Sequence, residues 1–159
     1  MRLRSLIPLA LSGLALTACL DTKNTGPQCQ ELPALSGTTV GDTLVIASGL
    51  KVLDTQLGTG AEVRTCQLMR VRYAGFLEDS TQFDSGTFDF VPGFHEVIRG
   101  FEQGVIGMKV GGSRRLVIPP SLGYGPRGAT DNLGNVVIPP NATLIFDVHA
   151  VAADTTRTF

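Results

Sequence analysis

The side chains able to do nucleophilic or metal chemistry are few and scattered in this sequence of 159 residues. His95 and His149 stand apart from each other and from the cysteines, and a metal site needs several such ligands together. Residues 123–128 fit the pattern G-x-G-x-x-G, but prolines before and inside it argue against the helix that a dinucleotide motif opens. The sequence therefore predicts no metal and no cofactor.

Aromatic residues and one aspartate form a second set of candidate functional residues. Taken singly, the phenylalanines and tyrosines favour a hydrophobic core, and Asp84, which precedes Ser85 and Gly86, favours a turn. Only as a set do they indicate a binding pocket, and the set comprises Tyr73, Phe83, Asp84, Phe88, Phe101, Tyr124 and Phe146. Whether they meet depends on the elements that carry them.

Short runs with a period of two predict a β-rich domain. The alternation is clearest at 67–77, where Met69, Val71 and Tyr73 share one face. We expect strands at 43–47, 50–57, 67–77, 87–91, 114–118 and 143–151.

One helix is expected at 95–105, because Val97, Phe101 and Val105 follow an i, i+4, i+8 stripe. Gly100 and Gly104 within it indicate close packing against another element. Residues 121–142 are expected to form a long loop of the functional or mobile kind. The predicted fold class is α+β, with the helix packed on one face of an antiparallel sheet.

The first eighteen residues predict a signal peptide, with two arginines followed by an uncharged apolar run. The sequence Leu-Thr-Ala-Cys at 16–19 resembles a bacterial lipobox, which implies lipidation of Cys19. Two acyl chains suffice for stable anchoring. We therefore expect a protein anchored to a membrane in the cell envelope, on its extracytoplasmic side, with residues 19–37 as a flexible tether and 38–159 as the folded domain.

Cys29 and Cys66 remain after lipidation of Cys19. An extracytoplasmic compartment permits a disulfide between them, which would join the tether to the domain. Two free thiols are the alternative.

The formal net charge is −1, and no basic stripe is present, so nucleic acid is not expected as a partner. Arg114 and Arg115 are the one notable basic pair, and we expect both to be solvated at the start of a strand.

Five motifs in order resemble the FKBP family of prolyl isomerases. They are Arg-Tyr-Ala-Gly-Phe-Leu at 72–77, Phe-Asp-Ser at 83–85, Glu-Val-Ile-Arg-Gly-Phe at 96–101, Gly-Tyr-Gly at 123–125 and the stretch 138–148. The resemblance covers about 48–152. It implies a curved antiparallel β-sheet wrapped around one short α-helix, and catalysis of rotation about X–Pro bonds.

Position by position, the resemblance implies a substrate pocket. Phe101 would form its floor where most members have Trp, Ile98 would offer its backbone N–H, Tyr124 its hydroxyl, and Asp84 would face the rotating amide. Tyr73, Phe83, Phe88, Val97, Ile138 and Phe146 would complete the walls. The stretch between Phe83 and Phe88 resembles a shortened loop, and 130–135 resembles an insertion.

Proline-containing segments of envelope or secreted proteins are therefore the expected partners, with the membrane reached through Cys19. Rapamycin-like macrolides are candidate ligands, and we expect a monomer. Two other functions remain open: a binding module or chaperone without turnover, and a purely structural lipoprotein. Retention of Tyr73, Asp84, Ile98 and Tyr124 together favours the isomerase.

Overall fold

The computed structural model describes residues 28–35 and 40–154. The expected signal segment at 1–18 and the expected lipidation site, Cys19, lie outside the described residues. Within the described part, no helix has the length and apolar character needed to cross a membrane.

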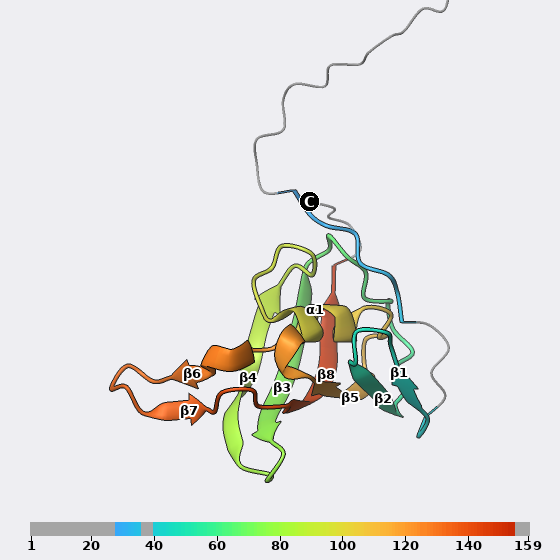
Figure 1. Ribbon diagram of the computed structural model, residues 1–159. Helices are drawn as coiled ribbons and strands as arrows, with labels where there is room; N and C mark the ends of the chain where they lie inside the picture. Colours follow the sequence, from blue (N-terminus) through green and yellow to red (C-terminus); the bar gives the residue numbers. More distant parts are fainter. Residues whose placement is uncertain (1–27, 36–39, 155–159) are drawn as a thin grey trace, which may run out of the picture.

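Six strands form one antiparallel sheet in the order β1-β2-β5-β8-β3-β4 (Figure 1). Their bounds are Thr43–Val45 (β1), Lys51–Gln56 (β2), Met69–Leu77 (β3), Gln82–Phe90 (β4), Ser113–Ile118 (β5) and Leu144–Ala153 (β8). Met69 and Val71 are buried while Arg70 and Arg72 are exposed, as their alternation predicts. The expected class, an antiparallel sheet with one short helix, is confirmed.

Helix α1 spans Arg99–Val105 and packs on one face of the sheet, chiefly against β5. A Cβ at Gly100 would collide with Ile118, and one at Gly104 would lie 2.6 Å from the side chain of Leu116. The two glycines therefore bring the helix backbone close to β5, as expected from the sequence. Phe101 and Val105 enter a core cluster shared with the inward side chains of β2, β3, β5 and β8.

The helix begins four residues later than its apolar stripe predicts. His95 has a positive φ of 60°, and Ile98 has an extended backbone (φ −60°, ψ 143°) at the N-cap. The buried carboxylate of Glu102 accepts a hydrogen bond from the His95 N–H at 2.8 Å and lies 3.2 Å from its imidazole Nδ1. Residues 95–98 are therefore not helical, and the prediction of helix over 95–98 is wrong.

Two other segments are more regular than expected. The strand predicted at 87–91 is the end of the nine-residue β4, so the stretch between Phe83 and Phe88 is strand rather than a short loop. The long loop predicted at 121–142 contains two short 3-10 turns, Pro120–Leu122 (η1) and Gly125–Arg127 (η2). It also contains a hairpin of β6 (Ala129–Thr130) and β7 (Val136–Ile138), which projects past β4 in Figure 1.

The segment 28–35 is held against the domain. A disulfide joins Cys29 to Cys66 rather than leaving two free thiols. The Gln30 N–H donates to the carbonyl of Gly93 at 3.0 Å, and Leu35 enters the core. This part of the expected tether is therefore packed on the domain rather than extending freely from it.

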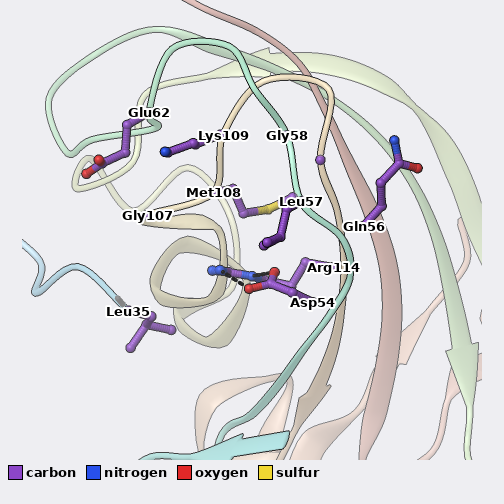
Figure 2. A pocket seen from close by; sticks show the side chains of 11 residues that line it. Leu35, Asp54, Gln56, Leu57, Gly58, Glu62, Gly107, Met108, Lys109 and Arg114 are labelled. Carbon is purple, nitrogen blue, oxygen red and sulfur yellow. Dashed lines mark hydrogen bonds and ion pairs between the residues drawn. The ribbon is translucent and has the colours of Figure 1, made fainter. Parts of the chain in front are cut away.

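A buried ion pair links β2 to β5 (Figure 2). Arg114 is 2% exposed and Asp54 4% exposed, and the guanidinium binds the carboxylate through Nε (2.6 Å) and Nη2 (3.0 Å). Nη1 also donates to the carbonyls of Gly104 (2.8 Å) and Ile106 (3.1 Å) at the end of α1. The prediction of a solvated pair was wrong for Arg114, because the inward phase of β5 places it beneath the helix. It was correct for Arg115, which is exposed.

Candidate functional site

A cavity of about 180 Å³ lies where α1 meets β3, β4 and β8. Nine of the ten residues that the resemblance assigned to the pocket line it: Tyr73, Phe83, Asp84, Phe88, Val97, Ile98, Phe101, Tyr124 and Phe146. They come from three strands, the helix, the 95–98 turn and the segment between η1 and η2. The fold thus brings together side chains that lie as far as 73 positions apart in sequence.

Ile138 and Glu96 depart from the expected set. Ile138 is buried in the hydrophobic core and does not line the cavity. Glu96 lines the cavity, and its carboxylate accepts a hydrogen bond from the Val91 N–H at 3.3 Å. The sequence analysis missed Glu96 as a site residue, although it opens the motif at 96–101.

An irregularity in β4 places two consecutive side chains on the cavity wall. Gly75 pairs with Asp84 and Phe76 pairs with Gln82, so Phe83 is an extra residue on β4. A bulge of this kind turns a side chain away from strict alternation, and Phe83 and Asp84 both line the cavity. Gly75 leaves the necessary room, because a Cβ there would lie 2.7 Å from Phe83 and 2.9 Å from Phe146.

The cavity walls are aromatic rings in edge-on and tilted contact. Phe101 is 3% exposed and packs edge-on against Phe146, with ring centroids 5.2 Å apart. Tyr73 packs edge-on against Phe88 at 5.3 Å, and Phe83 against Phe146 at 5.5 Å. Such pairs fix one another's orientation and stabilise beyond the area they bury. The result is a preformed apolar hollow with a few polar groups at its edge.

The polar edge is organised around Asp84. Its Oδ2 accepts a hydrogen bond from the Tyr73 hydroxyl at 2.6 Å, and its Oδ1 accepts one from the Ser85 N–H at 2.8 Å. Partial burial, followed by this hydrogen bond and the negative charge of Asp84, raises the pKa of Tyr73 to about 12. Burial and the same charge also raise the pKa of Tyr124. Both phenols are therefore protonated at neutral pH and can donate hydrogen bonds.

Ile98 presents a backbone donor at the cavity. Its carbonyl accepts hydrogen bonds from the N–H groups of Phe101 (3.0 Å) and Glu102 (3.2 Å), which starts the helix. Among the described residues, no acceptor is found for the Ile98 N–H itself. A peptide N–H without a partner at the edge of an apolar hollow is suited to bind a carbonyl oxygen.

The polar groups of this cavity can bind and orient a ligand, but they do not form a nucleophilic or metal-binding constellation. No cluster of three or more potential metal ligands occurs among residues 28–35 and 40–154. A larger hollow of about 300 Å³ beside the Asp54–Arg114 pair contains none of the expected pocket residues (Figure 2).

Comparisons with known proteins identify the family of this fold and site. A family model described as FKBP-type peptidyl-prolyl cis-trans isomerase matches residues 60–151. An FK506-binding protein of Neisseria meningitidis serogroup B is 44% identical over 105 residues, which are 63% of this chain and 92% of that protein. The crystal structure of AtFKBP13 superposes with a TM-score of 0.65 and 37% identity, covering 71% of this chain and 99% of that one. The chain belongs to the FKBP-type peptidyl-prolyl cis-trans isomerase family.

Some relatives are much longer than the matched region. FK506-binding protein 4 of Dictyostelium discoideum is 45% identical over 112 residues, which are 69% of this chain but 29% of that protein. The match to chloroplastic FKBP13 of Arabidopsis thaliana covers 62% of that protein. The chain thus spans less than two thirds of the length of these curated relatives.

Proposed function

We propose that this chain catalyses cis–trans isomerisation of X–Pro peptide bonds by non-covalent binding in the aromatic cavity. The observation that carries the proposal is the joint placement of the ring walls, the Tyr73–Asp84 hydrogen bond and the Ile98 N–H around one hollow. Family membership gives this arrangement its chemical context.

The reaction requires no bond cleavage, which suits a site without a nucleophile or metal ligands. The barrier to rotation is about 18–20 kcal/mol, and the uncatalysed reaction takes tens to hundreds of seconds. The planar amide is stabilised by resonance with charge separation, whereas the twisted amide has less. An apolar ring-walled hollow therefore disfavours the planar form relative to the twisted transition state.

Hydrogen bonds would hold the substrate in the conformation that rotates. The Ile98 N–H would bind a substrate carbonyl near the proline, and the Tyr124 hydroxyl would bind another. Tyr73 donates to Asp84, and this bond fixes both side chains against the rings. Each oxygen of Asp84 keeps a second lone pair and can face the rotating amide. Positioning of this kind lowers the entropic part of the barrier.

We also propose that the domain works in the cell envelope, anchored through Cys19. The lipobox-like sequence at 16–19 supports this setting, and the Cys29–Cys66 disulfide is compatible with an oxidising compartment. The substrates would be proline-containing segments of envelope or secreted proteins, and the protein would act as a monomer. Rapamycin-like macrolides would compete for the cavity. Mass spectrometry of the mature N-terminus tests lipidation, and an unmodified Cys19 thiol would rule it out.

The proposed activity is tested by NMR exchange spectroscopy on the peptide Ala-Leu-Pro-Phe. The wild-type protein should accelerate cis–trans exchange. Phe101→Ala should abolish most of the acceleration, and Tyr73→Phe should reduce it by loosening Asp84. Arg115→Met, an exposed change outside the cavity, is the matched control and should leave the rate unchanged. A folded wild-type protein without acceleration would exclude the isomerase and favour a binding module.

A further inference from the structure

A hollow of about 400 Å³ lies on the outer face of the sheet, opposite the face that α1 covers. Its polar side chains alternate along β3, β5 and β8 with residues of the hydrophobic core. On β8, for example, His149 lies between the buried residues Val148 and Ala150. Of the described residues that line this hollow or the aromatic cavity, only Tyr73 lines both. The proposed function therefore leaves the polar side chains of this hollow unused.

Three polar side chains cross this hollow in one row. Arg72 on β3 pairs directly with His149 on β8, and His149 pairs directly with Ser113 on β5. Residues in such register have Cβ atoms about 4.5–5.5 Å apart, and all three line the hollow. Because an arginine side chain is long, one small ligand above His149 can contact the whole row.

Arg72 differs from the other three arginines of β3 and β5 in having no carboxylate. Arg70, Arg114 and Arg115 each bind a carboxylate through two nitrogens. Among residues 28–35 and 40–154, no carboxylate or hydrogen-bond partner is found for the Arg72 guanidinium. Asp147 also lines the hollow, but Arg115 already binds it with two contacts of 2.7 Å. The hollow therefore keeps one positive charge that no carboxylate balances.

The Ser113–His149 pair supplies a further hydrogen-bond donor beside Arg72. The Oγ atom of Ser113 lies 3.0 Å from Nδ1 of His149. When the hydroxyl donates to Nδ1, the imidazole proton is on Nε2; when Nδ1–H donates, the hydroxyl proton is free. In either arrangement the pair keeps one donor. This donor can bind an anion that Arg72 attracts.

We propose that Arg72, His149 and Ser113 form a binding site for a phosphate group on the outer face of the sheet. A guanidinium binds a carboxylate or a phosphate through two parallel hydrogen bonds. A carboxylate has only two oxygens, which the guanidinium alone would occupy. A phosphate group has further oxygens, which can accept a hydrogen bond from the Ser113–His149 pair. The phosphate can belong to a soluble molecule or to a lipid headgroup, because the recognising chemistry is the same.

The test is an NMR titration of the chain with inorganic phosphate at constant ionic strength. Cys19→Ser is present in every sample, so that no acyl chain is attached. The amide resonances of Arg72 and His149 should shift and saturate. Arg72→Gln should weaken binding about tenfold or more, because it removes two charge-assisted hydrogen bonds, and Ser113→Ala should weaken it by a smaller factor. Arg127→Gln removes the same charge from an exposed site in η2 and is the matched control, which should bind as the parent does.

A second arm, co-sedimentation with phosphatidylglycerol vesicles, identifies the source of the phosphate. Vesicle binding that Arg72→Gln removes would assign a lipid headgroup and support the site. Saturable binding of inorganic phosphate without vesicle binding would assign a soluble phosphate compound and support it equally. Absence of both, or acetate binding as tight as phosphate binding, would overturn the proposal. An equal loss of affinity in Arg127→Gln would also overturn it, because binding would then follow net charge alone.

Discussion

Substitution of Arg114 should lower the free energy of unfolding far more than substitution of its neighbour Arg115. Both Arg114 and Arg115 bind a carboxylate through two nitrogens, at 2.6 and 3.0 Å for Arg114 and at 2.7 Å twice for Arg115 with Asp147. The geometry is thus nearly matched, whereas the burial is not. Side-chain exposure is 2% and 5% in the first pair but 48% and 44% in the second.

Arg114→Met should lower the free energy of unfolding by about 3–5 kcal/mol, because it leaves the Asp54 carboxylate buried without its cation. It also removes the donors to the carbonyls of Gly104 and Ile106 at the end of α1. Arg115→Met should cost less than ~1 kcal/mol, because water and salt screen an exposed pair. The double variant Asp54→Leu with Arg114→Met should be more stable than Arg114→Met alone, since it removes the buried carboxylate together with its cation.

Urea unfolding followed by circular dichroism measures all four proteins under one set of conditions. The m-value reports whether the native state stays compact. Equal losses for Arg114→Met and Arg115→Met would refute the reasoning from burial. A double variant that is less stable than the Arg114 single variant would refute the argument that the buried negative charge of Asp54 destabilises the protein when Arg114 is absent.

Two further predictions concern the tyrosines and the disulfide. The chain has two tyrosines and no tryptophan, so ultraviolet titration should show Tyr73 ionising near pH 12 and Tyr124 above its ordinary value of 10.0. Because the pKa of Tyr73 is higher in the folded protein, its protonated hydroxyl contributes fully to stability below pH ~10, and this contribution is lost as the pH rises through about 12. Two tyrosines that titrate together at their ordinary pKa of 10.0 in the folded protein would contradict the prediction. Cys29→Ser with Cys66→Ser should cost about 4 kcal/mol, from the 37-residue separation that the disulfide closes. Guanidinium unfolding checks this value, and a loss below ~1 kcal/mol would mean that 28–35 contributes little constraint.

The alternation of residues 114–118 indicates that Arg114 points inward, although the pair Arg114 and Arg115 was predicted to be solvated. Arg114, Leu116 and Ile118 share one phase of their strand, and Leu50, Val52 and Asp54 share one phase of the partner strand. Two opposite charges in the buried phase of neighbouring strands indicate a buried ion pair. Strand order, however, was needed to show that the two strands are neighbours.

The start of the helix and the hairpin were set by tertiary contacts. The stripe from Val97 to Val105 carries no signal for the contact between His95 and Glu102, which accompanies the late start of the helix at Arg99. The strands of the hairpin are two and three residues long, too short to give a periodic pattern. Local sequence is uninformative at such lengths, and the hydrogen bonds of the turn decide the structure.

The site residues were predicted mainly from family motifs, and the structure explains why they meet. Simple alternation places Phe83 and Asp84 on opposite faces of a strand, and the extra residue in β4 brings both to the cavity. Glu96 was missed because its neighbours Val97 and Ile98 carried the motif. Its hydrogen bond to the Val91 N–H depends on a turn that the sequence did not predict.

Amide chemical-shift mapping with the peptide Ala-Leu-Pro-Phe shows whether proline peptides bind in the aromatic cavity. Binding in the cavity should give the largest shift at the Ile98 N–H, with smaller shifts at Val97 and Phe101. Shifts concentrated at Leu57 and Lys109, in the larger hollow of Figure 2, would contradict it and place the peptide elsewhere on the domain.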